Sequence, residues 1–103
     1  MAQDYSNVKE FPATKRFTLS ATSNRVTQIT LPRGAGRIQL GSVNEIKVTH
    51  EGTDNTAIGS DYMFVPANNV LSIRLGRGNN RLDDIYVAAT AASTIVSILF
   101  EEL

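Results

Sequence analysis

The chain has 103 residues with ten basic and ten acidic side chains, one histidine and no cysteine. A chain of this length fits a single domain with one core, and the missing thiols exclude disulfides and thiolate metal sites. A formal net charge of zero creates no overall field toward a phosphate backbone or an anionic bilayer, so we expect neither a nucleic acid nor a membrane as partner.

Residues 1–14 form a polar segment with three isolated apolar side chains, Tyr5, Val8 and Phe11. Pro12 interrupts the one short pattern in this segment, so we expect an arm rather than a strand. Untied termini tend to be disordered, but three spaced apolar side chains are more than a solvated tail needs. Two interpretations stay open: a frayed terminus, or an arm that is mobile on the isolated subunit and docks Tyr5, Val8 and Phe11 on a neighbouring chain.

From Lys15 onward, apolar and polar residues alternate with a period of two, in runs separated by turn residues such as Thr22-Ser23-Asn24. Residues 51–61 and 76–81 form two longer loops. The alternation predicts eight short strands, at 15–21, 26–31, 37–42, 46–50, 62–65, 70–75, 83–89 and 94–100. No segment keeps a helical period for more than a turn, so residues 15–103 are predicted to form an all-β domain, an antiparallel two-sheet sandwich or a closed barrel.

The last stretch, residues 83–103, carries the longest apolar pattern in the chain. It predicts two strands joined by a small-residue turn, which together would form a C-terminal hairpin. The second strand is apolar on both faces from Ile95 to Phe100, which predicts a central strand covered on both sides, with Val96, Ile98 and Phe100 in the core. The acidic pairs at 83–84 and 101–102 are predicted to oppose edge-to-edge pairing of this hairpin.

Patterns that would support catalysis or metal binding are weak. His50 lies on a predicted strand with only Glu51 beside it, and this favours a packed or surface histidine over a catalytic base. Asp54, Asn55 and Asp61 do not have the spacing of a calcium loop. We therefore predict a protein that is not an enzyme and has no cofactor, no metal and no small-molecule substrate.

Arginine recurs in two glycine-containing segments, residues 33–37 and 74–81. Neither segment contains an aromatic residue on which a nucleic-acid base could stack, and neither has the spacing of a phosphate-binding loop. Arginine is the charged residue enriched at protein interfaces, so these segments are interface candidates or solvated turns. The candidate interface residues are Arg33, Arg37, Arg77 and Arg81, together with the three apolar residues of the arm.

Four segments in sequence order carry a resemblance: ITLPRGAGRIQL at 29–40, EIKVTHEGTD at 45–54, YMFVPAN at 62–68 and DDIYVAATAASTIVSILFEE at 83–102. They resemble small β-sandwich structural proteins of tailed bacteriophage virions, of the head-decoration or cement type. The resemblance implies a jelly-roll-like sandwich with no cofactor and no reaction. It also implies a homo-oligomer whose partners are the major capsid protein or other virion proteins.

The leading interpretation is thus a phage capsid decoration or cement protein that bridges neighbouring major capsid subunits. No apolar run approaches the ~20 residues of a membrane span, and residues 1–11 lack the pattern of a secretion signal, so we expect assembly into a virion in the host cytoplasm. The alternative is a receptor- or carbohydrate-binding β-sandwich module of a phage tail or surface protein. That function favours exposed aromatics for sugar stacking, and the chain has no tryptophan and three tyrosines, Tyr5, Tyr62 and Tyr86.

Overall fold

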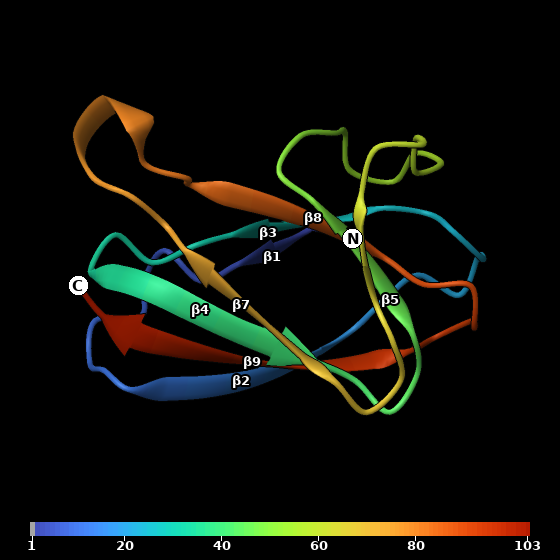
Figure 1. Ribbon diagram of the computed structural model, residues 1–103, viewed down its shortest axis with the longest axis horizontal. Coiled ribbons are helices and arrows are strands. Elements are labelled where there is room, and N and C mark those ends of the chain that lie inside the picture. The colour runs from blue at the N-terminus through green and yellow to red at the C-terminus, as the bar shows by residue number, and fades with distance from the viewer. Residues whose placement is uncertain (1) are drawn as a thin grey trace.

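The structure is a computed structural model that describes residues 2–103, so Met1 of the expected arm lies outside the described residues. Two β-sheets pack face to face (Figure 1). A short 3₁₀ helix, η1 (Gly78–Asn80), lies between the seventh and eighth strands. The strands are β1 Gln3–Asp4, β2 Ala13–Thr18, β3 Thr27–Thr30, β4 Ala35–Gly41, β5 Ile46–Thr49, β6 Met63–Val65, β7 Val70–Arg74, β8 Asp84–Ala88 and β9 Ile95–Glu102. All eight predicted strands are present, and β1 is an additional one.

The pairing of the strands is nested. One sheet has the order β1-β3-β8-β5-β6 and the other has the order β2-β9-β4-β7. The antiparallel pairs β2·β9, β3·β8, β4·β7 and β5·β6 join the first strand of this series to the last, the second to the next to last, and so on inward. A long hairpin rolled up in this way is a jelly roll. The predicted jelly-roll-like two-sheet sandwich is confirmed, and the closed barrel is not formed.

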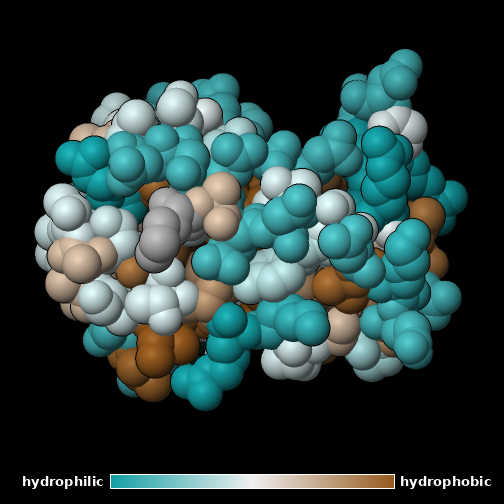
Figure 2. Space-filling view, turned by 180° about the vertical axis from the view of Figure 1, so that it is seen from behind, coloured by the Kyte–Doolittle hydropathy of each residue, from teal (hydrophilic) through white to brown (hydrophobic). Residues whose placement is uncertain are grey.

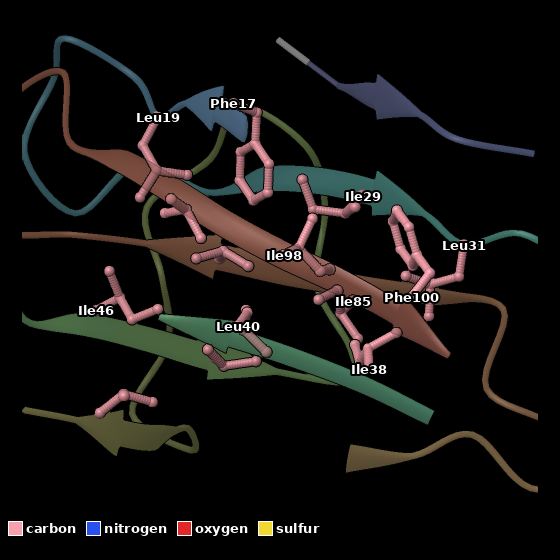
Figure 3. Close-up of a cluster of buried hydrophobic side chains, with 14 of the residues drawn as sticks. Phe17, Leu19, Ile29, Leu31, Ile38, Leu40, Ile46, Ile85, Ile98 and Phe100 are labelled. Atoms are coloured by element: carbon pink, nitrogen blue, oxygen red, sulfur yellow. The ribbon is translucent and has the colours of Figure 1, made fainter. Parts of the chain in front are cut away.

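The core lies between the two sheets and consists of the inward-facing residues of the alternating strands (Figure 3). Burial alternates along β9, where Val96, Ile98 and Phe100 are fully buried, as predicted. The opposite sheet contributes Ile29 and Ile85, which are equally inaccessible. The period of two in the sequence therefore corresponds directly to the inner and outer faces of the sheets.

The C-terminal stretch differs from the prediction in its pairing. β8 pairs with β3 and β5 in one sheet, whereas β9 pairs with β2 and β4 in the other, so the two strands form an arch between the sheets rather than a hairpin. Ser93, with a φ of 54°, lies in the turn that makes this crossing. β9 is central, as predicted, but its outer face is not covered: within residues 2–103 no further layer packs on this sheet, and Ile95 is 45% exposed.

The acidic residues of this stretch were predicted to oppose edge-to-edge pairing, and this prediction is wrong. β8 and β9 are interior strands with a neighbour on each side, so these residues do not lie at sheet edges. Asp84 accepts hydrogen bonds from the side chains of Gln28 and Thr30 on β3, at 3.2 and 3.0 Å. Glu101 forms an ion pair with Arg37 on β4. These carboxylates connect neighbouring strands within the sheets.

Residues 2–14 were predicted to form an arm rather than a strand, but they contribute β1 and the first two residues of β2 and pack on the sandwich. β1 pairs in parallel with β3, and the Tyr5 N–H donates to the Thr30 carbonyl at 2.9 Å. The Tyr5 ring lies 5.4 Å from the Phe100 ring, centroid to centroid, and burial raises the pKa of its hydroxyl. β2 begins at Ala13, before the predicted boundary at Lys15. A two-residue strand is too short to show a period of two, so the alternation could not reveal β1.

Replacing Phe100 by alanine is expected to lower the free energy of unfolding by about 3–5 kcal/mol, because the ring is fully buried and the substitution leaves a cavity. Ile95→Ala on the exposed face of the same strand is the matched control and should cost far less. Urea unfolding of the three proteins measures both values. A Phe100→Ala protein as stable as the wild type would show that β9 does not carry the core.

Replacing Tyr5 by alanine is expected to destabilise the protein by about 1–2 kcal/mol, because its partly buried ring contacts Phe17 and Phe100. Asn7→Ala, at an exposed position of the same segment, is the control. Thermal unfolding followed by circular dichroism gives the comparison. If both variants melted together with the wild type, residues 2–12 would behave as the free arm that the sequence suggested.

Candidate interaction site

The sandwich has two sides where an edge of one sheet faces an edge of the other. On one side, residues 2–12 cover the β3 edge with β1 and place Tyr5 against Phe17 of β2 and Phe100 of β9. On the other side, β6 and β7 are the edge strands, and no further strand pairs with either of them among residues 2–103. The first side is closed by the chain itself, and the second is open.

A hollow of about 530 Å³ lies on the open side. Its wall is mostly apolar, and its polar groups come from the end of β5 and from the loop that precedes β6. The lining residues are Val48, Thr49, His50, Ser60, Asp61, Tyr62, Met63, Leu71, Ile73, Leu82 and Ile85. A mainly apolar hollow of this size with a few polar groups has the dimensions of a binding site.

The apolar side chains of the hollow occupy positions that alternation assigns to the core. Met63 and Val65 are two residues apart on β6, so both point toward the inside of the sandwich. Val65 is 3% exposed, but Met63 is 61% exposed. Leu71 and Ile73 on β7 point inward in the same way and are half-buried against the core. The open side therefore leaves core-type residues in contact with water.

The polar residues His50, Ser60 and Asp61 line the hollow. The sequence favoured a packed or surface histidine at this position, and His50 is exposed, directly after β5. Lys47 donates a hydrogen bond to the Asn24 side chain at 2.8 Å, and its Nζ lies 5.3 Å from the centre of the Tyr62 ring. Within residues 2–103 there is no group of three or more histidine, aspartate or glutamate side chains placed to hold a metal ion.

Arg37, one of the predicted interface residues, is paired within the chain. Its guanidinium binds both carboxylate oxygens of Glu101 at 2.9 Å, and Gln39 donates to the same carboxylate at 2.7 Å. The hydrogen bonds from Arg37 and Gln39 lower the pKa of Glu101, and the carboxylate raises the pKa of Arg37. Register explains the contact, because Arg37 and Glu101 are direct neighbours on β4 and β9.

Arg81 is also used within the chain. Its side chain is only 12% exposed, and its guanidinium donates to the carbonyls of Ala35 and Pro32 at 2.6 and 2.5 Å. A further ion pair joins its Nε to Asp83 at 3.4 Å. Arg81 thus ties the loop before β8 to the turn between β3 and β4.

Arg33 and Arg77 are the two remaining predicted interface arginines, and both are exposed, as Arg37 is. Arg77 and Arg37 lie at one depression, which Arg74 also lines, whereas Arg33 lies in the turn beside Gly34. A Cβ on Gly34 would lie 2.8 Å from the Phe11 ring, so the glycine lets this ring approach the turn. The structure therefore brings Arg37 and Arg77 together and leaves Arg33 near the N-terminal segment.

Tyr5 and Phe11 of the predicted interface pack partly buried against the core, and Val8 is half-buried, with its N–H bonded to the Tyr5 carbonyl at 3.0 Å. Their contact with a partner stays a prediction. Sequence reasoning missed the hollow and its residues Met63, Leu71 and Ile73. The sequence contained part of the signal for this site, because a short strand after a long loop indicates a sheet edge that the chain itself leaves uncovered.

The fold and the hollow define a jelly-roll β-sandwich with one uncovered side. Comparisons with protein-family models, curated proteins and solved structures found no match for this chain. Among the described residues, no helix has the length and apolar character needed to cross a membrane.

The ion pair of Glu101 predicts a pH dependence of stability. Because the folded protein lowers the pKa of Glu101 below its ordinary value of 4.5, the stabilisation is complete above that value and is lost as the pH falls through the folded pKa. We expect Glu101→Gln to melt below the wild type at pH 7 and the difference to shrink below about pH 4.5. Glu45→Gln, at an exposed position, is the control. A difference that stayed constant down to pH 2 would exclude ionisation of Glu101 as its cause.

Proposed function

We propose that this protein is a non-enzymatic structural component of a bacteriophage virion. Its most specific form is a capsid decoration or cement protein that bridges neighbouring major capsid subunits, as a homo-oligomer. The observation that carries the proposal is the nested jelly-roll pairing of β2 through β9. Jelly rolls form viral capsid domains, and also lectin domains and cupins, so the fold supports the proposal by analogy.

Apolar groups on the surface add support for contacts with other chains. Figure 2 shows a face that is mostly hydrophilic, with apolar groups gathered in separate places. Val43 and Val70 are 73% and 65% exposed and line a depression of about 380 Å³ at residues of β4, β7 and β9. Together with the open side at β6 and β7, this gives the protein two apolar areas that water covers in the isolated chain. Such areas are typical of surfaces that bind other proteins.

In the proposed role, the sandwich is a rigid body and its exposed side chains make the contacts with capsid subunits. Arg33 and Arg77 are the candidates on the arginine segments, because Arg37 and Arg81 already bind groups within the chain. A single contact of this kind is weak. Many copies on a symmetric shell make the attachment strong, because each further contact forms at high effective concentration.

Co-sedimentation with purified empty heads of tailed phages tests the role. We expect the wild type to bind heads and the Arg33→Ala/Arg77→Ala double variant to bind at least about tenfold more weakly, since arginines in protein interfaces often contribute strongly to binding. The melting temperature should not change, because both residues are exposed. Arg16→Ala, at an exposed position of β2, is the control and should bind as the wild type does.

A receptor- or carbohydrate-binding module is the second candidate. Tyr62 favours it, because this residue is 37% exposed and lines the hollow together with His50 and Asp61. One face of that ring is already taken by Lys47, which leaves a smaller surface for a sugar. A glycan panel run with the same preparation separates the two functions. A bound glycan that Tyr62→Ala abolishes, without attachment to any head, would replace the virion role by the second candidate.

A further inference from the structure

The chain closes one side of its own sandwich with an extended segment. β1 adds to the β3 edge through main-chain pairing, and Tyr5, the next residue, contacts the core rings Phe17 and Phe100. The segment thus combines a strand added to an edge with an aromatic side chain placed between the sheets. The opposite side offers the same two features, a free edge and an apolar space, with neither filled.

The free edge belongs to β7. Leu75 continues the ladder beyond β7, and its N–H donates to the Gly36 carbonyl of β4 at 3.0 Å. The main-chain N–H and C=O groups of successive residues in an antiparallel strand point alternately to its two sides. Since those of Leu75 are on the β4 side, the N–H and C=O of Ile73, two residues earlier, also point toward β4. The N–H and C=O of Ser72 therefore point away from β4, toward the open side. No strand among the described residues pairs with this edge.

The apolar space is the hollow beside that edge. Met63, Leu71 and Ile73 point into it from β6 and β7, and Leu82 and Ile85 complete its wall. Its volume of about 530 Å³ accommodates bulky apolar side chains. An extended peptide on β7 directs every second side chain to the same face of the sheet. Main-chain pairing with Ser72 and filling of the hollow are thus compatible with a single bound strand.

We propose that the β7 edge and the hollow together bind an extended segment of another protein, in which bulky apolar side chains alternate with polar ones. The segment pairs with the main chain of Ser72 and places an apolar side chain between Met63, Leu71 and Ile73. This is recognition by strand addition, in which backbone hydrogen bonds give affinity and the side-chain pocket gives specificity. The inference stands on the geometry of the open side and is independent of the virion role.

Two other occupants fit less well. A small apolar molecule would fill the hollow but leave the main-chain groups of Ser72 unpaired. A second copy that paired its own β7 here would present Leu71 and Ile73, which already pack against its own core, so these side chains are less available to fill the hollow of the other copy. A segment from a different chain uses both features.

A synthetic heptapeptide serves as the test ligand. Its sequence is TITFTIT in one-letter code, and it is fluorescein-labelled, acetylated and amidated. We expect its fluorescence anisotropy to rise with added wild-type protein. Ser72→Pro should weaken binding by about tenfold or more, because proline removes the outward N–H and its ring obstructs the edge. The fold should be kept, since proline is tolerated where the N–H of an edge strand faces solvent. Equal melting temperatures of Ser72→Pro and the wild type would verify that the variant is folded.

Thr18→Pro is the matched control on the other free edge of the same sheet. Leu19 donates to the Thr94 carbonyl, so by the same alternation the Thr18 N–H points away from β9, and this proline should leave peptide binding unchanged. Met63→Glu, at a largely exposed position, tests the hollow separately and should also weaken binding by about tenfold, since it places a charge against the apolar side chain.

Three results would overturn the proposal. The first is no binding of the peptide to the wild type at millimolar concentration, or equal binding to Ser72→Pro. The second is equal binding of a peptide N-methylated at alternate residues, which would indicate a pocket for small apolar molecules. The third is concentration-dependent dimerisation in sedimentation velocity that Ser72→Pro abolishes, which would assign the edge to a second copy of this chain.

Discussion

The structure depends on the burial of β9 between β2 and β4. This strand pairs with β2 over residues 95–100 and with β4 over residues 97–102. Val96, Ile98 and Phe100 project from it into the core. Because β2 is near the start of the chain and β9 at its end, the sheet forms only when the two ends of the chain meet. The remaining pairs then nest inside this one, and the two apolar faces can close on each other.

Nested pairing also determines where the sandwich has edge strands and an uncovered core. Each sheet ends in an edge strand on each side, and facing edges leave a gap between the sheets. On the side of β2 and β3, the chain fills the gap with its own N-terminal segment, and Gly34 provides room for the Phe11 ring. On the side of β6 and β7, the chain leaves the gap open, and the apolar residues there stay in water. An exposed edge beside an apolar hollow is costly for an isolated protein, and the strand addition proposed for this side would remove that cost.

Several charged residues link neighbouring elements within the chain, although the net charge is zero. Glu101 and Asp84 link strands inside the two sheets, and Arg81 holds a loop against the turn between β3 and β4. These contacts position the elements next to the open side without lining it. Arg33 and Arg77 are exposed, and in the proposed virion role they contact other chains.

Local patterns in the sequence determined the eight strands, the buried face of β9 and the absence of long helices, because a period of two depends only on which residues face the core. These local patterns did not determine which strands pair with one another. The arch between β8 and β9 and the role of Glu101 follow from the order of strands in the sheets, which is set by contacts between distant residues. The docking of Tyr5 and the exposure of Met63 were likewise decided by the tertiary structure, because whether an inward-facing side chain is covered depends on which segment lies across the edge of the sandwich.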